Sequence, residues 1–362
     1  MQDNKILIFS DLHFGIDNSS QNRLDDTVNC VKWIANVAEE NSATKCVFAG
    51  DWFHHRDEID VRAMITAKNS LEMLSEVFDE IVLISGNHDY YYNNSNDISS
   101  IEMFKNIRSN IIVVDKKPQQ FFLNGKTILL TPWFYNPTVD GGNADAMIGH
   151  FEYVGGKMNG CLSKIGHSPK SMLKIAPLVF TGHYHLTNEV EYENGKIVTI
   201  GSPYQQDWGD YGDNKRVILF DGTEYESVYN QISPQYMKID YSRLENASDE
   251  ILNKLFSNQV VQNGFVKIIS DGNTDFDKIN RITEIGNLCG VRKLEIDHTC
   301  GMTSINESIE EDIKDISSKN LRSYVHEFAN KNMDDNGLSE HSDKIHKLID
   351  TYFEQAEGAI TK

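Results

Sequence analysis

Residues 81–89 read Ile81-Val82-Leu83-Ile84-Ser85-Gly86-Asn87-His88-Asp89, an aliphatic run followed by a glycine and three polar side chains. A short aliphatic run bounded by glycine predicts a buried strand. Polar groups that directly follow such a strand lie at its carboxyl end, where open α/β sheets hold their sites. The stretch therefore predicts an α/β fold with a site at this edge of the sheet.

Four more segments repeat this arrangement, each after an aliphatic run. They are Asp11-Leu12-His13, Gly50-Asp51, Gly149-His150 and Gly182-His183-Tyr184-His185. The glycines of these motifs let the backbone turn sharply and approach a metal or a substrate without a Cβ clash. Each segment alone is a weak signal, because a lone Asp-x-His or Gly-Asp usually marks a turn or a helix cap. All five in this order are a strong one.

Together the five segments supply carboxylates, an amide oxygen and imidazoles. Imidazole suits Zn, Fe and Ni, whereas carboxylates and carbonyls suit Mg and Mn. Two divalent cations about 3.5–4 Å apart can clamp a phosphate, lower the pKa of a bridging water and offset charge on the attacking and leaving oxygens. The residue types therefore indicate a two-metal phosphoesterase.

One histidine of the set has a competitor. His150 ends the run Ala146-Met147-Ile148-Gly149, which also fits a core strand with a hydrogen-bonded histidine. The alternative ligand is His167, in Gly166-His167-Ser168. We favour His150 because a strand-like run directly precedes it, whereas His167 lies in a loop rich in Gly, Ser, Pro and Lys.

The five segments resemble the D-x-H, G-D, G-N-H-D/E, H and G-H-x-H pattern of the calcineurin-like metallophosphoesterase superfamily. The resemblance covers the first two thirds of the chain. It implies a four-layer αββα sandwich. It also implies the following ligands: Asp11, His13 and His185 for one metal, Asn87, His150 and His183 for the other, and Asp51 bridging both.

A further histidine indicates which family within this superfamily the chain resembles. The chain reads Gly50-Asp51-Trp52-Phe53-His54, and a histidine three residues past the bridging aspartate is similar to the nuclease subunit of SbcCD-type DNA repair complexes, including bacteriophage recombination endonucleases. This implies that His54 assists phosphate binding beside His88. The wider superfamily resemblance implies that His88 protonates the leaving oxygen or orients the phosphate, and Asp89 is placed to orient the His88 imidazole. The alternative is that His54, or its neighbour His55, caps a helix or faces solvent.

The resemblance implies a metal-dependent DNA nuclease with two divalent metal ions, Mn²⁺ as the expected metal and Mg²⁺ as the alternative. Such an enzyme degrades duplex DNA from the 3′ end, nicks single strands, works with a coiled-coil ABC-type ATPase and forms a homodimer. Two other functions compete. A phosphodiesterase or phosphoprotein phosphatase acting on a small or protein substrate predicts neither His54 nor a distal helical tail. The complete ligand set argues against a non-catalytic scaffold.

Three parts are expected along the chain. Residues 1–238 form the phosphoesterase domain. Residues 239–304 carry a β-α-β pattern that is similar to the family's capping, DNA-contacting domain, although a plain structural lobe fits as well. Residues 305–362 form a linker and a helical tail with apolar residues at helical spacing. In the resembled family such a tail grips the ATPase coiled coil, and the alternative is packing on its own catalytic domain.

Composition limits the partners. Asp and Glu number 54 against 34 Lys and Arg, a net charge of −20, so the chain alone should bind DNA weakly unless a partner supplies contacts or the substrate is small. Five cysteines without regular spacing favour a reducing compartment. With neither a signal peptide nor a membrane span expected, we predict a cytoplasmic protein, in the host if phage-encoded. The helix expected over Leu24–Val37 has an apolar stripe for its own core or the dimer interface.

Overall fold

Residues alternate between two cores along the strand β1 (Ile6–Phe9), which lies inside the first of two mixed sheets. The computed structural model describes residues 5–136, 143–158, 161–270 and 274–298, with a few separate residues between 326 and 350. Leu7 and Phe9 pack under helices, whereas Ile6 and Ile8 pack between the sheets. This period-two alternation is what a strand buried on both faces requires.

The first sheet has the strand order β14-β13-β1-β2-β3-β4. Strands β1 to β4 run parallel, and β13 and β14 are antiparallel additions at one edge. The carboxyl ends of the parallel strands therefore meet at one edge of the sheet. The remaining bounds are β2 (Lys45–Ala49), β3 (Glu80–Ile84), β4 (Ile111–Val114), β13 (Arg216–Phe220) and β14 (Tyr225–Tyr229).

The second sheet has the order β11-β12-β10-β7-β6-β5. Its four central strands are parallel, and an antiparallel strand closes each edge. A separate pair, β8 and β9, is antiparallel. The bounds are β5 (Gln119–Leu123), β6 (Lys126–Thr131), β7 (Ala146–His150), β8 (Lys157–Met158), β9 (Cys161–Leu162), β10 (Leu178–Gly182), β11 (Asn188–Tyr192) and β12 (Gly195–Thr199).

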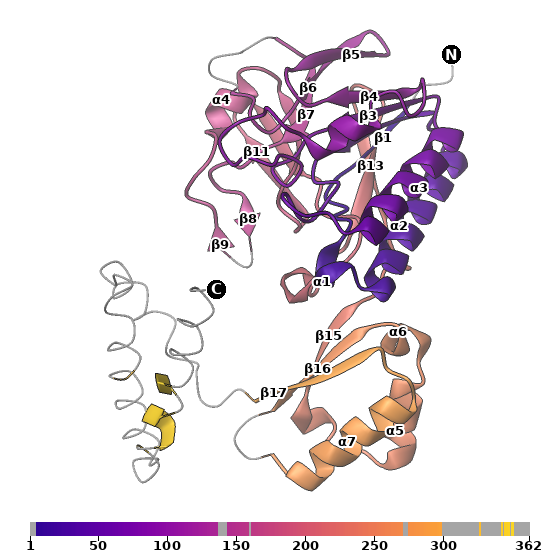
Figure 1. Ribbon diagram of the computed structural model, residues 1–362, viewed down its shortest axis with the longest axis vertical. Coiled ribbons are helices and arrows are strands. Elements are labelled where there is room, and N and C mark those ends of the chain that lie inside the picture. The colour runs from indigo at the N-terminus through magenta and orange to yellow at the C-terminus, as the bar shows by residue number, and fades with distance from the viewer. Residues whose placement is uncertain are drawn as a thin grey trace. The chain divides into compact units, whose positions relative to one another are not determined.

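Helices cover the outer face of each sheet. Helices α2 (Gln21–Glu40) and α3 (Val61–Val77) lie side by side on the first sheet (Figure 1). Helix α4 (Pro169–Leu173) packs on the second sheet. The chain thus forms an α/β fold with two mixed sheets between helical layers. The shorter helices are α1 (Ile16–Ser19), η1 (Ser100–Phe104), η2 (Trp208–Asp210) and η3 (Tyr241–Arg243).

The apolar stripe of α2 serves the core. Val31, Ile34 and Ala38 are buried against the first sheet together with residues of α3. The stripe is expected to serve either its own core or a dimer interface, and the structure shows core packing. No helix among the described residues is long and apolar enough to cross a membrane.

A smaller lobe follows the two sheets. Its sheet has the order β15-β16-β17, with β15 and β16 parallel, and its own apolar core. The first strand begins at Tyr236, so it runs across the expected boundary at 238/239, and the expected domain division stays a prediction. The bounds are β15 (Tyr236–Asp240), β16 (Phe265–Ser270), β17 (Lys293–His298), α5 (Asp249–Phe256), α6 (Gln259–Gln262) and α7 (Phe276–Leu288).

A largely buried ion cluster joins this lobe to α2. Arg292 of the lobe binds both carboxylate oxygens of Asp26 at 2.8 Å, and Arg23 binds the same carboxylate at 2.8 Å. Both arginines also lie over the ring of Phe265. Breaking such a buried cluster is costly, so the lobe is fixed to the first layer of helices. The expected helical tail at 305–362 falls outside the described residues, apart from the few separate ones between 326 and 350.

Candidate metal centre

Strand ends of both sheets deliver the expected ligands. Asp11, Asp51 and Asn87 follow the carboxyl ends of β1, β2 and β3. His150 ends β7, and His183 follows β10, on the neighbouring parallel strands of the second sheet. Because the two sheets stack on each other, their strand ends bring residues from both halves of the phosphoesterase region into one site.

The backbone is strained at this edge. Asp11, His13, Asp51 and His183 have φ values of 55°, 49°, 63° and 85°, in the left-handed region that side chains other than glycine avoid. Each such residue costs on the order of 1–3 kcal/mol and persists only where its surroundings hold it. Backbone hydrogen bonds hold two of these residues in place. The N–H of Asp11 donates to the Gly50 carbonyl at 2.9 Å, and the N–H of His13 donates to the Asp51 carbonyl at 3.1 Å.

Gly50 is required by both conformation and space. Its φ is +98°, and a Cβ there would lie 2.3 Å from Nδ1 of His150. We expect Gly50→Ala to lower the free energy of unfolding by about 2–5 kcal/mol, because backbone strain adds to a clash in a filled core. Denaturant unfolding measures this loss.

Gly125 is the matched control, since its φ is +81° and no described atom lies within 4 Å of an added Cβ. Gly125→Ala should cost only about 1–2 kcal/mol, the strain alone. Equal losses in the two variants would mean that the close approach of Gly50 to His150 contributes nothing.

Asp11, His13 and His185 form the first group of potential ligands. The Nε2 atoms of His13 and His185 lie 3.0 Å apart, and the Asp11 carboxylate lies 3.8 Å from the first and 4.0 Å from the second. The Asp11 carboxylate also accepts the backbone N–H of His183. All three side chains expected to hold one metal therefore converge.

Asn87, His150 and His183 form the second group. The amide oxygen of Asn87 lies 3.0 Å from Nε2 of His150 and 2.9 Å from Nδ1 of His183. Nδ1 of His150 donates to the Ala49 carbonyl at 2.8 Å, which leaves Nε2 as the ligand atom. The three residues expected for the other metal also converge.

Asp51 lies between the two groups. Its Oδ2 atom is 3.6 Å from Nε2 of His13 and 3.3 Å from Nε2 of His150. Burial by itself would raise the pKa of Asp51, but His150 and His13 outweigh burial and hold it well below its usual value. A fully ionised, buried carboxylate that reaches both groups is what a bridging ligand needs.

The residues fit two divalent cations. Burial lowers the pKa of His183 to about 3 and that of His13 well below its usual value, so both rings are neutral, the form that binds metals. At His150 the Asp51 carboxylate outweighs burial and raises the pKa to about 9, so a cation bound there would displace a proton. Imidazole nitrogens that face each other at 3.0 Å, next to buried carboxylates, form a donor set for a cation.

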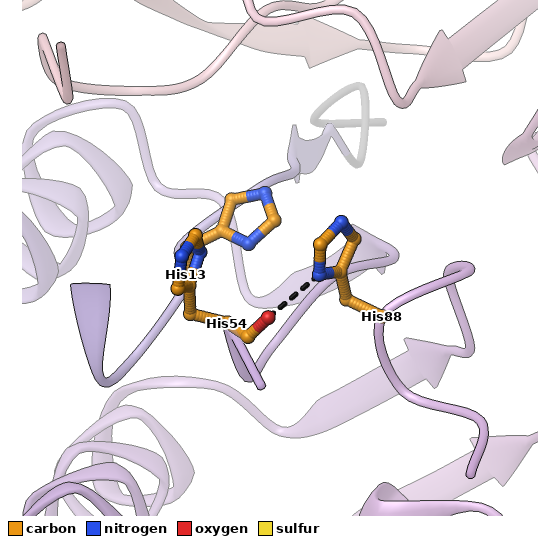
Figure 2. A group of neighbouring side chains, drawn as sticks. All are labelled: His13, His54 and His88. Atoms are coloured by element: carbon orange, nitrogen blue, oxygen red, sulfur yellow. Dashed lines mark hydrogen bonds between the residues drawn. The ribbon is translucent and has the colours of Figure 1, made fainter. Parts of the chain in front are cut away.

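A second cluster lies beside the first metal group. Nitrogen atoms of His13, His54 and His88 lie within 4.8 Å of one another (Figure 2). The rings of His54 and His88 are stacked at 5.8 Å, and Nδ1 of His88 donates to the His54 backbone carbonyl at 2.6 Å. Burial, with His55 and His88 nearby, lowers the pKa of His54 to about 4. The sequence-predicted pair His54 and His88 thus meets beside the ligands.

Asp89 makes contacts that differ from the expected one with His88. Its carboxylate accepts backbone N–H groups of Asp51, Trp52 and Gly86 at 2.9–3.0 Å, and of Phe53 at 3.3 Å. Burial, with Asp51 nearby, raises its pKa to about 7. The carboxylate points at the backbone because these turns leave N–H groups without strand partners, so Asp89 holds the ligand loops and the His54 carbonyl orients His88.

The structure separates the two competing histidines. His150 is fully buried among the ligands. His167 lies outside that cluster, where its backbone N–H donates to the Glu152 carbonyl at 2.7 Å and its ring packs on Phe151. The geometry favours His150 as the ligand.

Sequence patterns missed the groups behind the ligands. Nε2 of Gln206 donates to the Asp11 carbonyl at 2.5 Å. The ammonium of Lys215, buried against Asp210 at 2.6 Å, donates to the His185 carbonyl at 2.7 Å. The ring of Trp133 packs 5.0 Å from that of His183. The only sequence signal for Gln206 and Lys215 is that polar residues cluster after Gly201.

The family model described as calcineurin-like phosphoesterase matches residues 4–259. The chain belongs to this family. It is a metal-dependent phosphoesterase in which the matched region holds every side chain expected in the site. The site therefore has the ligands for divalent metals and a cluster of histidines at their edge.

Solved structures of low identity match part of the chain. A novel archaeal phosphodiesterase is 12% identical, with a TM-score of 0.36, over 62% of this chain and 99% of its own. Phosphopantetheinyl hydrolase from Mycobacterium tuberculosis is 13% identical, with a TM-score of 0.37, over 65% and 98%. A single mutant of Vps29 from Entamoeba histolytica is 12% identical, with a TM-score of 0.30, over 63% and 99%. No curated protein matches the chain.

Proposed function

We propose that this phosphoesterase is a DNA nuclease that uses Mn²⁺, with Mg²⁺ as the alternative. The observation that carries the proposal is the position of His54, which lies with His88 and His13 in one cluster. A phosphodiester in a nucleic acid needs a contact for its non-bridging oxygen and a proton for its leaving sugar oxygen. The two stacked histidines supply a group for each of these tasks.

The roles of the chain's own residues follow from their contacts. One cation would be held by Asp11, His13 and His185. The other would be held by Asn87, His150 and His183, and Asp51 would contact both. When bound there, the two cations would supply charge stabilisation and an activated water. His88 donates its Nδ1–H to the His54 carbonyl, so the proton that it gives to the leaving oxygen is a second one, carried on Nε2 by the protonated ring. The neutral His54 ring donates a hydrogen bond to the phosphate.

Net charge bears on how DNA is held. At −20, the chain needs cations in its site and positive groups from elsewhere to hold a phosphate backbone. We propose that the lobe of β15–β17 caps the DNA, that the active form is a homodimer, and that a coiled-coil ABC-type ATPase binds the chain through residues 305–362.

The function is tested with two substrates and two matched variants. Purified protein with Mn²⁺ should cleave linear DNA and bis-p-nitrophenyl phosphate, and neither without divalent metal. His54→Ala should lower DNA cleavage by at least about tenfold, the value of a hydrogen bond to a charged group. Asp57→Ala is the control, because this residue lies in the same loop and is exposed. Hydrolysis of the small diester with no cleavage of DNA would instead favour a small-substrate phosphodiesterase.

Removing the tail tests the partner. We expect a chain ending at residue 304 to keep Mn²⁺-dependent cleavage of short or single-stranded DNA and to lose ATP-stimulated processing of long duplexes. Co-purification with coiled-coil ATPases and the two cleavage assays measure this. A truncated chain that still co-purifies with the ATPase, or that no longer folds, would contradict tail docking.

A further inference from the structure

A pocket lies next to the second metal group and takes no part in the roles assigned above. It has a volume of about 270 Å³ and is lined by Trp133, Phe134, Tyr135, Glu152 and His167, among others. This volume is just below the range of about 300–1,000 Å³ that holds drug-sized ligands, so the pocket fits a single ring system.

Trp133 connects the pocket to the metal ligands. Its ring centroid lies 5.0 Å from that of His183 and 5.8 Å from that of His150. Glu152 follows His150 by two residues at the end of β7. A group held in the pocket would therefore be joined to a phosphate on the metals by only a short linkage.

The pocket walls are fixed by the fold. The backbone N–H of Trp133 donates to the Ser85 carbonyl at 3.0 Å, which ties this turn to the end of β3. The ring of Phe134 packs on Tyr90 at 5.0 Å. His167, which also lines the pocket, forms a parallel bridge with Tyr153, and burial lowers the pKa of His167, so its ring is neutral. Because these contacts fix the walls, the pocket is preorganised for a ligand.

We infer that this pocket binds the nucleobase of a nucleotide beside the cleaved phosphate, stacked on Trp133, and this inference rests on the proposed nuclease function. Aromatic faces suit any base because every base has a π-face. The Glu152 carboxylate accepts a base N–H at the rim. His167, the rejected metal ligand, lines the pocket.

The test compares two single-stranded oligonucleotides that differ only in the two nucleotides that flank one phosphate. The two nucleotides flanking it either carry bases or are abasic, and kcat/KM for cleavage there is measured with Mn²⁺. We expect the wild type to prefer the base-carrying substrate by at least about fivefold, the low end of base–aromatic stacking. Trp133→Ala should bring this ratio close to one, and Trp133→Phe should keep most of it. The control, Phe122→Ala, removes an exposed aromatic side chain of β5 and should leave the ratio unchanged.

Using a ratio separates base binding from general damage to the site. Equal losses of Trp133→Ala on both substrates would give Trp133 a structural role and overturn the inference. A wild-type ratio of one would overturn it too, with the nuclease function intact. If the wild type cleaves neither oligonucleotide but hydrolyses bis-p-nitrophenyl phosphate, the nuclease function and the base pocket both fail.

Discussion

Asp51→Ala should lose both cations, whereas Asn87→Ala should lose chiefly one. Asp51 Oδ2 lies within 3.6 Å of both His13 and His150, one from each ligand group. Asn87 Oδ1 contacts only His150 and His183 among the described ligands. Because removing the shared carboxylate weakens both positions, phosphodiester hydrolysis by Asp51→Ala should fall to the level of metal-free protein.

Elemental analysis after gel filtration in Mn²⁺ measures the metal content of both variants. Asp57→Ala, at an exposed position in the same loop as Asp51, is the control and should keep both ions. Two ions per chain in Asp51→Ala, or none in Asn87→Ala, would contradict the assignment of Asp51 as the bridge.

His88→Ala should keep both metals and lose about two to four orders of magnitude in rate, the usual scale of general acid catalysis. The side chain contacts the His54 carbonyl through Nδ1, and it belongs to neither of the two ligand groups assigned above, although its ring lies 4.9 Å from that of the ligand His13. Its backbone N–H, which donates to Asp51 at 2.8 Å, is present in the variant as well. Metal binding should therefore survive the change.

Rate and metal content are measured on the same preparation. A substrate with a good leaving group, such as bis-p-nitrophenyl phosphate, needs less help from an acid, so its loss should be smaller than that for DNA. Full activity on DNA, or loss of metal along with activity, would contradict a proton-handling role for His88.

Sequence periodicity and order were sufficient to predict the α/β fold and the convergence of the ligands. Each motif follows an aliphatic run, and parallel strands bring their carboxyl ends together wherever they lie in the chain. That is why Asp11 and His183, 172 positions apart, could be expected in one site. The β-α-β pattern expected within 239–304 is present as β16, α7 and β17.

The supporting groups could not be predicted in this way. Asp89 adjoins His88 in sequence, but its carboxylate turns to backbone N–H groups 36–38 positions away. Which neighbour it contacts depends on how two loops pack, and no periodicity encodes that. The same is true of Lys215 behind His185 and of Trp133 beside His183, since each meets its partner only in the folded chain.

The central claim is that these strand ends hold two cations. Anomalous scattering from a crystal grown with Mn²⁺ tests it most directly. We predict two full peaks per chain, about 3.5–4 Å apart, one among Asp11, His13 and His185 and the other among Asn87, His150 and His183, with Asp51 contacting both. A single peak, or peaks outside these residues, would contradict the two-metal centre.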